Sequence, residues 1–244
     1  MVKKRLDSLL VEKQLTNSRE EAKRLILAGK TLVNGVALSK VGSLINEESD
    51  IKLKDKGHPF VSRGGLKLAG ALKEFNVKVR GLTALDAGAS TGGFADCLLQ
   101  NGVKKVFAVD VGYGQLAWKI RNDPRIVTIE KKNVRYLTIS DLGEAVDLAV
   151  IDLSFISVKL VLPAIISVLK REGRIISLIK PQFEVGKGEV GKGGIVRDKK
   201  KHIKVLNDIS QFTKDAGLDV LGHVQSPIAG AKGNTEYFFL FALN

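Results

Sequence analysis

The chain has 244 residues, 44% of them hydrophobic, which is enough for one ordinary α/β domain and a small additional one. Its 39 basic and 26 acidic side chains give a formal net charge of +13. This excess favours a polyanionic partner, either nucleic acid or an anionic membrane surface. The single cysteine, Cys97, excludes an internal disulfide, and the three histidines show no zinc-site spacing, so we expect no metal.

The sequence does not predict a membrane-spanning segment. Its apolar stretches, such as residues 146–151, stop far short of the roughly 20 residues that cross a bilayer. The basic start, residues 1–5, precedes no apolar core of a signal peptide. We therefore expect a cytoplasmic protein.

The first part of the chain predicts a small α+β unit. One helix is expected over residues 5–14, and a second begins after the N-cap residue Ser18 and ends at Gly29. An Asn-Gly pair predicts a hairpin within residues 30–38, and residues 50–53 predict another short strand. The segment RLDSLLVEKQLTNSREEAKRLILAGKTLVNG resembles the S4 fold of ribosomal proteins and RNA-modifying enzymes. In that family the second helix lies against RNA.

From residue 64 onward, helices and strands alternate in the manner of a parallel α/β sheet. Helices are expected near residues 64–75, 92–101, 115–121, 158–170 and 199–216. Strands are expected near residues 82–87, 105–110, 125–129, 146–151, 174–180, 218–224 and 236–242. The sequence thus predicts an S4-type domain at 1–58, a linker at 59–63, and a Rossmann-like domain with a mixed seven-stranded sheet at 64–244.

Basic side chains are placed where they could contact RNA. Several lie along one side of the second helix, and others lie in the Gly- and Lys-rich loop 181–197, which is too long for a simple connection. In both places the alternative is a solvated charged surface. The expected RNA contacts are Lys4, Arg5, Arg19, Lys23, Arg24, Lys30, Arg63, Lys187, Lys192 and Arg197.

Residues 82–94, LTALDAGASTGGF, predict a strand that enters a glycine turn and then a helix. The spacing is not G-x-G-x-x-G, and Asp86 would lie where a dinucleotide needs its pyrophosphate, so a cationic ligand suits the turn better. S-adenosylmethionine carries an ammonium and a sulfonium, and Asp110 after the next strand can accept hydrogen bonds from its ribose. A dehydrogenase is the alternative for the turn, and helix capping is the alternative for each aspartate.

The fold class we expect is therefore a class I methyltransferase, with a mixed seven-stranded sheet, preceded by the S4 domain. A second glycine-rich segment, residues 186–192, matches most of a phosphate-loop pattern, but Gly193 replaces the residue that would hold magnesium. The expected cofactor-binding residues are Asp86, Gly88, Ser90, Gly92, Gly93, Phe94, Asp110, Val111, Asn133 and Asp152.

Three charged residues follow or precede strands at one expected edge of the sheet: Asp152, Lys180 and Glu236. Glu236 joins this edge only if the last strand runs antiparallel to the others. Lys67, in the helix before the sheet, could bring a fourth charge there; its alternative is a solvated lysine.

The segments GASTGGF, VDVGYGQLAWKIRNDPR, IDLSFIS, IKPQFEVGKGEVGKGGIVRD and GNTEYFF together resemble the TlyA family, ribosomal RNA 2′-O-methyltransferases often named haemolysins. The wider FtsJ-type group uses a Lys-Asp-Lys-Glu tetrad, and the resemblance places it on Lys67, Asp152, Lys180 and Glu236. It implies methylation of a ribose, that of a cytidine, in ribosomal RNA. The RNA, within a ribosomal subunit, is the expected partner.

Lys180 is the candidate base for the ribose hydroxyl. Because a free lysine is protonated at neutral pH, this role requires desolvation or the nearby cation Lys67. In the alternative, Lys180 stays charged and positions the hydroxyl while Asp152 or Glu236 takes the proton.

Three other functions compete with this hypothesis. A membrane-active haemolysin conflicts with the absence of a spanning or lipid-anchored segment in the sequence. A non-catalytic RNA-binding or ribosome-assembly factor conflicts with the complete tetrad. A pseudouridine synthase with an S4 domain would need a different, β-rich catalytic domain.

Overall fold

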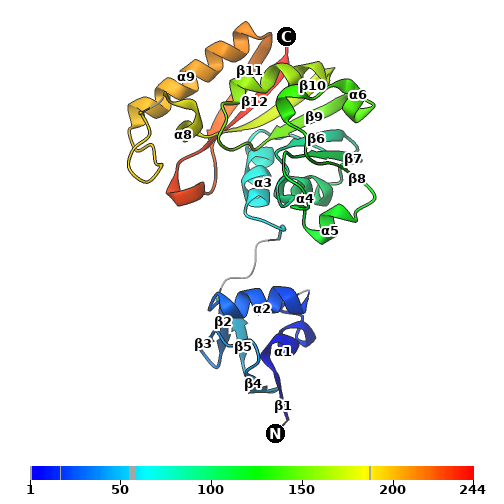
Figure 1. The fold of residues 1–244 in the computed structure, drawn as a ribbon, viewed down its shortest axis with the longest axis vertical. Coiled ribbons are helices and arrows are strands. Elements are labelled where there is room, and N and C mark those ends of the chain that lie inside the picture. Colours follow the sequence, from blue (N-terminus) through cyan, green and yellow to red (C-terminus); the bar gives the residue numbers. More distant parts are fainter. Residues whose placement is uncertain (1, 17, 55–58, 187) are drawn as a thin grey trace. The chain divides into compact units, whose positions relative to one another are not determined.

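The computed structural model describes residues 2–16, 18–54, 59–186 and 188–244. The chain divides into two compact units, Met1–Gly57 and His58–Asn244 (Figure 1).

The first unit is a small α+β domain. Its elements are β1 (Lys3–Arg5), α1 (Leu6–Glu12), α2 (Arg19–Leu27), β2 (Thr31–Val33), β3 (Val36–Leu38), β4 (Leu44–Asn46) and β5 (Ile51–Leu53). The expected N-cap is present, since the Ser18 side chain accepts a hydrogen bond from Glu21 N at 3.2 Å. Leucines of α1, Ile26 of α2 and Val33 of β2 share one buried core. We did not predict the antiparallel pair β1–β4, because two three-residue strands carry too little hydrophobic alternation to be recognised.

The second unit is built on a seven-stranded sheet. Its strands are β6 (Thr83–Ala87), β7 (Lys105–Val109), β8 (Ile126–Ile129), β9 (Val146–Ile151), β10 (Leu169–Ile179), β11 (Leu218–Gln225) and β12 (Tyr237–Leu243). They lie in the order β11-β12-β10-β9-β6-β7-β8. β12 runs antiparallel to both its neighbours, and β6 to β10 pair in parallel, so the expected mixed sheet is confirmed and the condition that places Glu236 at the shared edge is met.

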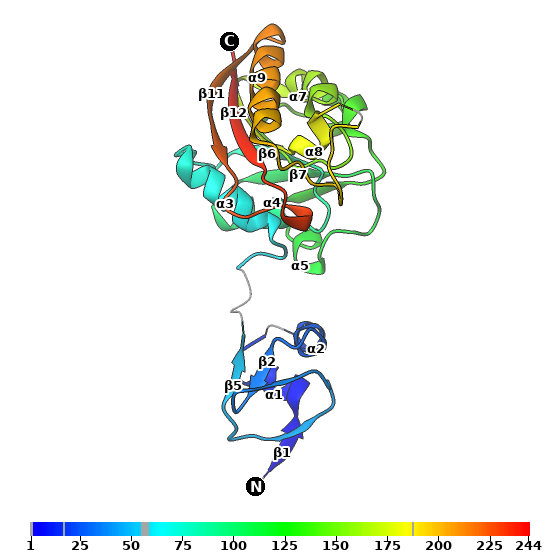
Figure 2. The same cartoon turned by 90° about the vertical axis from the view of Figure 1, so that its left-hand side faces the viewer.

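Helices cover both faces of this sheet (Figure 2). They are α3 (Gly64–Glu74), α4 (Gly93–Gln100), α5 (Trp118–Arg121), α6 (Ile139–Leu142), α7 (Leu162–Ser167), α8 (Pro181–Glu184) and α9 (Lys199–Asp215), with short 3₁₀ turns η1 (Val134–Tyr136), η2 (Val158–Leu160) and η3 (Ala231–Gly233). Along β6, Ala84 packs with α3 and α4, whereas Leu85 packs with α7 and α9. This alternation explains why the strand is apolar throughout: both of its faces are buried.

One expected helix was too long. The apolar residues of 158–170 predicted a single helix, but α7 ends at Ser167 and β10 already begins at Leu169. The register of β10 against β9 shifts between Leu169 and Arg174, so the first part of β10 is irregular. A continuous apolar pattern could not reveal that break.

Candidate active site

The turn after β6 is so tight that some of its positions accept only glycine. Gly88 has φ +91°, and a Cβ at this position would lie 2.5 Å from the backbone oxygen of Asp152. Gly92, with φ +90°, is the N-cap of α4. The chain thus turns sharply from strand to helix beside the end of β9, as a ligand-binding turn requires.

Asp86 lies beneath this turn and is completely buried. Its Oδ2 accepts a hydrogen bond from Ala95 N in the first turn of α4, at 2.9 Å, so the capping alternative describes its contact here. Its Oδ1 is also buried and has no hydrogen-bond partner among the described residues. Burial, followed by the nearby charge of Asp152, raises the pKa of Asp86 to about 8.

Asp110 joins the turns that follow β6 and β7. Its Oδ2 accepts a hydrogen bond from Ser90 N at 2.8 Å, and its Oδ1 accepts one from Gly112 N at 2.7 Å. Each carboxylate oxygen has a second lone pair, so these bonds leave room for two ligand hydroxyls. Next to it, Val111 is 65% exposed, while Asn133 uses its side chain to cap η1.

The four expected tetrad residues form two lysine–carboxylate pairs. Lys67 Nζ on α3 donates to Glu236 Oε2 just before β12 at 2.5 Å. Lys180, after β10, places its Nζ 2.6 Å from Oδ1 of Asp152, after β9; the two form an ion pair whose angles do not meet those of a hydrogen bond. The same Nζ donates a hydrogen bond to Ser154 Oγ at 3.0 Å. All four side chains are at most 22% exposed. Strand ends and a helix that are far apart in the sequence therefore bring these four charged side chains together at the carboxyl-end edge of the sheet.

These pairs and the glycine turn line one cavity of about 370 Å³. Its lining contains Lys67, Asp152 and Lys180. Glu236 is not part of the lining but contacts two residues that are, Lys67 and Gly230. The other lining residues come from the chain before α3, the β6 turn and the loop before β12: Ser62, Arg63, Gly64, Gly88, Ala89, Ser90, Thr91, Gly93, Phe94, Ser154, Ala229, Gly230 and Ala231. A cavity of this size accommodates a small cofactor.

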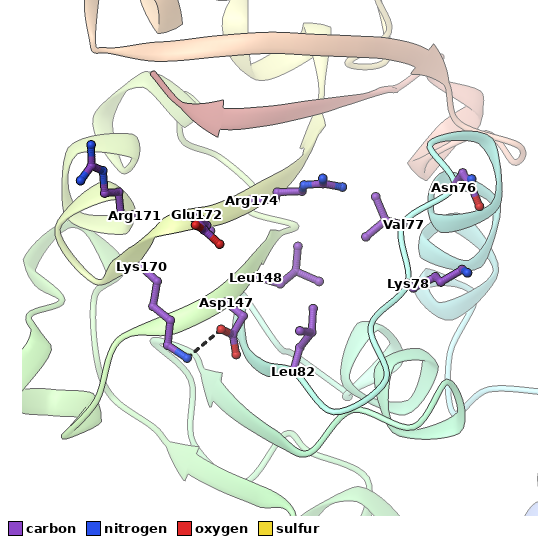
Figure 3. A pocket seen from close by; sticks show the side chains of 11 residues that line it. Asn76, Val77, Lys78, Leu82, Asp147, Leu148, Lys170, Arg171, Glu172 and Arg174 are labelled. Atoms are coloured by element: carbon purple, nitrogen blue, oxygen red, sulfur yellow. Dashed lines mark hydrogen bonds and ion pairs between the residues drawn. The ribbon is translucent and has the colours of Figure 1, made fainter.

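A larger cavity, of about 670 Å³, lies at the opposite edge of the sheet (Figure 3). It is lined by Leu82 and Asp147, at the beginnings of β6 and β9, and by the irregular part of β10. Asp147 is paired there with Lys170 at 2.7 Å. Ligands of parallel α/β sheets bind at the carboxyl ends of the strands, so we assign the site to the smaller cavity.

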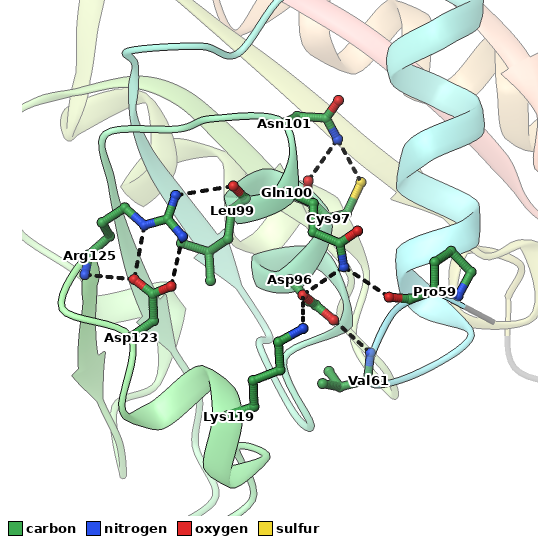
Figure 4. A network of polar contacts seen from close by, with 10 residues as sticks. All are labelled: Pro59, Val61, Asp96, Cys97, Leu99, Gln100, Asn101, Lys119, Asp123 and Arg125. Carbon is green, nitrogen blue, oxygen red and sulfur yellow. Dashed lines mark hydrogen bonds and ion pairs between the residues drawn. The ribbon is translucent and has the colours of Figure 1, made fainter. Parts of the chain in front are cut away.

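A polar network that we did not predict holds residues 59–61 against α4 (Figure 4). Asp96, only 1% exposed, accepts hydrogen bonds from Val61 N at 2.8 Å and from Gln100 Nε2 at 3.0 Å. Gln100 Nε2 also donates to the backbone oxygen of Pro59 at 2.9 Å. The segment expected as a linker thus contacts α4, the helix that begins at the glycine turn.

Most of the expected RNA contacts in the first unit also have acidic partners within it. Asp7, whose side chain is fully buried, binds Arg5 at 2.9 Å and Arg19 at 3.0 Å, and these two arginines hold its pKa down at about 2. Lys4 pairs with Glu12 and Glu47, and Lys23 pairs with Glu20, while Arg24 and Lys30 are exposed. In the second unit, Arg63, Lys192 and Arg197 are exposed; Lys187 lies outside the described residues.

The parallel sheet with an antiparallel last strand, the glycine turn and the acid after β7 together define the class I methyltransferase fold. A model of the FtsJ-like methyltransferase family matches residues 60–243, and an S4 domain model matches residues 4–51. The chain therefore belongs to the FtsJ-like methyltransferase family, and the resemblance to its TlyA members is confirmed.

Proteins similar to this chain match nearly all of it. A Bacillus subtilis protein named as a candidate rRNA methyltransferase, YqxC, is 49% identical over 238 residues, covering 96% of this chain and 84% of that protein. The 16S/23S rRNA (cytidine-2′-O)-methyltransferase TlyA of Mycobacterium tuberculosis is 45% identical over 235 residues, covering 96% and 88%. A solved Streptococcus thermophilus protein named as a candidate hemolysin is 43% identical, with a TM-score of 0.78, covering 100% and 90%.

Among the described residues, no helix is both long and apolar enough to cross a bilayer.

Proposed function

We propose that this protein transfers a methyl group from S-adenosylmethionine to the 2′-hydroxyl of a cytidine in ribosomal RNA. The observation that carries the proposal is the meeting of two buried lysine–carboxylate pairs beside a glycine turn at the carboxyl ends of the strands. The names of the Mycobacterium tuberculosis and Bacillus subtilis relatives support ribosomal RNA as the substrate, and the first of them supports cytidine. Such a substrate implies action in the cytoplasm.

The residues around the glycine turn suit S-adenosylmethionine. Gly88, where a Cβ would collide with the backbone of Asp152, lets the turn pack against the end of β9, and the buried Asp86 Oδ1 lacks a hydrogen-bond partner among the described residues. Asp110 would hold the ribose hydroxyls, and the exposed Val111 would cover the adenine. When bound, the cofactor supplies a methyl group on a sulfonium that an oxygen nucleophile can attack.

Lys180 and Asp152 form the proposed proton-accepting unit. A ribose hydroxyl is a poor nucleophile and has to be positioned and relieved of its proton. Lys180 can receive that proton only after it has given one up, and Asp152 Oδ1, at 2.6 Å, is the adjacent acceptor. Lys67 and Glu236 form the second pair, which orients the hydroxyl from the other side.

The test is the transfer of labelled methyl from S-adenosylmethionine to unmodified ribosomal subunits, followed by mapping of the modified nucleotide. We expect 2′-O-methylation by the parent protein and none by Lys180→Ala. Lys170→Ala, which changes a lysine at the opposite edge of the sheet, is the matched control and should retain activity. Cofactor binding without transfer to any subunit or free RNA would favour a non-catalytic RNA-binding factor.

A second variant separates the two roles of Lys180. Arginine keeps the positive charge but cannot act as a base. We expect Lys180→Arg to lose activity at every pH, whereas a merely positioning lysine would leave substantial activity. Leakage of liposomes at the same protein concentrations tests the membrane-active alternative, and we expect none.

A further inference from the structure

Two loops meet beside Glu236 at the carboxyl-end edge of the sheet. We call residues 188–197, which precede α9, the basic loop, and residues 226–236, which precede β12, the β12 turn. Both lie at the same end of the second unit (Figure 1). The basic loop carries exposed cations, and the β12 turn supplies Ala229, Gly230 and Ala231 to the wall of the active-site cavity.

Asn234, near the end of the β12 turn, bonds to both loops. Its side chain is buried, with 3% exposure. Its Oδ1 accepts a hydrogen bond from Val196 N at 3.2 Å, and its Nδ2 donates to the backbone oxygens of Gly194 at 2.9 Å and Ala231 at 3.2 Å. A reversed amide would set oxygen against two carbonyls and nitrogen against an N–H, so these partners fix its orientation.

The basic loop is ordered by further contacts around the same point. His202 on α9 contacts the backbone oxygen of Val196 through Nε2 at 2.8 Å and the hydroxyl of Tyr237 through Nδ1 at 3.0 Å. Gly191 N donates to the backbone oxygen of Ile195 at 3.1 Å, which closes the loop on itself. Val196 is therefore held from two sides, by His202 and by Asn234, and the position of the neighbouring Arg197 follows from it.

The β12 turn in turn packs directly on the tetrad. Gly230 N donates to the backbone oxygen of Asn234 at 2.8 Å. A Cβ on Gly230 would overlap the carboxylate of Glu236, so there is no space between the turn and this side chain. Asn234 thus lies two residues from Glu236 and joins a wall of the cavity to the basic loop.

We infer that Asn234 is a positioning residue that holds the basic loop at the mouth of the active site, so that its cations meet the RNA phosphates flanking the target ribose. The inference rests on the proposed function. Lys192 and Arg197 are exposed, and neither forms an ion pair among the described residues. Without the amide, the loop would lose its bonds to the β12 turn, and its cations would no longer be fixed relative to Glu236.

Two substitutions distinguish positioning from simple loss of packing. Asn234→Ala removes all three side-chain bonds. Asn234→Asp keeps the acceptor for Val196 N but sets a carboxylate oxygen against the carbonyls of Gly194 and Ala231, so it should restore nothing. Asn101→Ala is the matched control, because it removes an asparagine amide bond of 2.8 Å at the far end of α4.

The experiment measures methyl transfer to ribosomal subunits, affinity for a fluorescent rRNA fragment, affinity for S-adenosylmethionine, and trypsin cleavage after Lys192 and Arg197. For both Asn234 variants we expect a rise in KM and in the RNA dissociation constant on the order of tenfold, with faster cleavage. We expect cofactor affinity to stay within about twofold of the parent. Asn101→Ala should match the parent in all four.

Unchanged RNA affinity and cleavage in Asn234→Ala would overturn the inference. So would a fall in kcat alone, because that would assign Asn234 to the chemistry at Glu236 rather than to the loop. If the parent protein transferred no methyl, the proposed function would fail. RNA affinity and cleavage would then still decide the role of Asn234, since neither requires turnover.

Discussion

The Lys67–Glu236 ion pair allows a test of how much a buried pair of charges stabilises the second unit against unfolding. Lys67 is 12% exposed and Glu236 only 2%, and their charged atoms lie 2.5 Å apart. Lys67→Met keeps the volume of the side chain but leaves the buried carboxylate without its cation. Breaking one half of a buried pair costs about 3–5 kcal/mol of unfolding free energy. For a unit of this size, that lowers Tm by about 6–20 °C.

Differential scanning calorimetry of the full chain at neutral pH measures this loss. The double variant Lys67→Met/Glu236→Gln removes both charges and should regain most of the lost Tm, since no uncompensated charge stays buried. Lys105→Met breaks the exposed pair with Glu144 in the same unit and should leave Tm close to that of the parent. If Lys67→Met also left Tm unchanged, or if the double variant were no better than the single one, the pair would not be an important electrostatic contact.

Three further predictions follow from the same geometry. Gly88→Ala should abolish methyl transfer and weaken cofactor binding in calorimetry, because its Cβ meets the backbone of Asp152; Gly143→Ala, with φ +79° but open space around it, should retain both. Burial raises the pKa of Asp86 to about 8, so its stabilising contribution is full below about pH 4 and is lost as the pH rises toward 8. In urea unfolding between pH 5 and 8, the parent should therefore lose stability relative to Asp86→Asn, and parallel pH profiles would contradict this. Replacing Lys192 and Arg197 by alanine should lower the slope of log affinity for RNA against log salt by about 1–2; an unchanged slope would mean that the loop is merely solvated.

The order of strands and helices was predictable because their hydrophobic residues follow periodic patterns in the sequence. Runs of apolar residues gave the buried strands, and the charged residues after them gave the edge where Asp152 and Lys180 meet. The direction of β12 could only be stated as a condition, since hydrophobic alternation does not depend on strand direction. The early end of α7 was missed for the related reason that Val168 and Leu169 are apolar in either structure.

The supporting polar residues were not predictable in the same way. Asn234 and Asp96 each bond to a backbone group far along the chain, Gly194 for one and Val61 for the other. A backbone group has no residue-specific signal, so no sequence spacing indicates these bonds. The sequence indicated these two residues only by their closeness to recognised motifs. Asn234 lies within GNTEYFF, and Asp96 follows GASTGGF by two residues.

The arrangement of charges explains how one edge of a sheet can serve two ligands of opposite charge. The four tetrad residues form two neutral pairs, so they impose little net field of their own. On the β6–β7 side the turns carry the carboxyl groups of Asp86 and Asp110, and a bound cationic cofactor would favour the ionised form of the buried Asp86. Arg63 in the cavity wall and Arg197 in the basic loop are exposed, and both suit a polyanion. In the proposed function, a neutral reaction centre between an acidic and a basic region would keep the two ligands from competing for the same charges, and this would require the basic loop to be held in place.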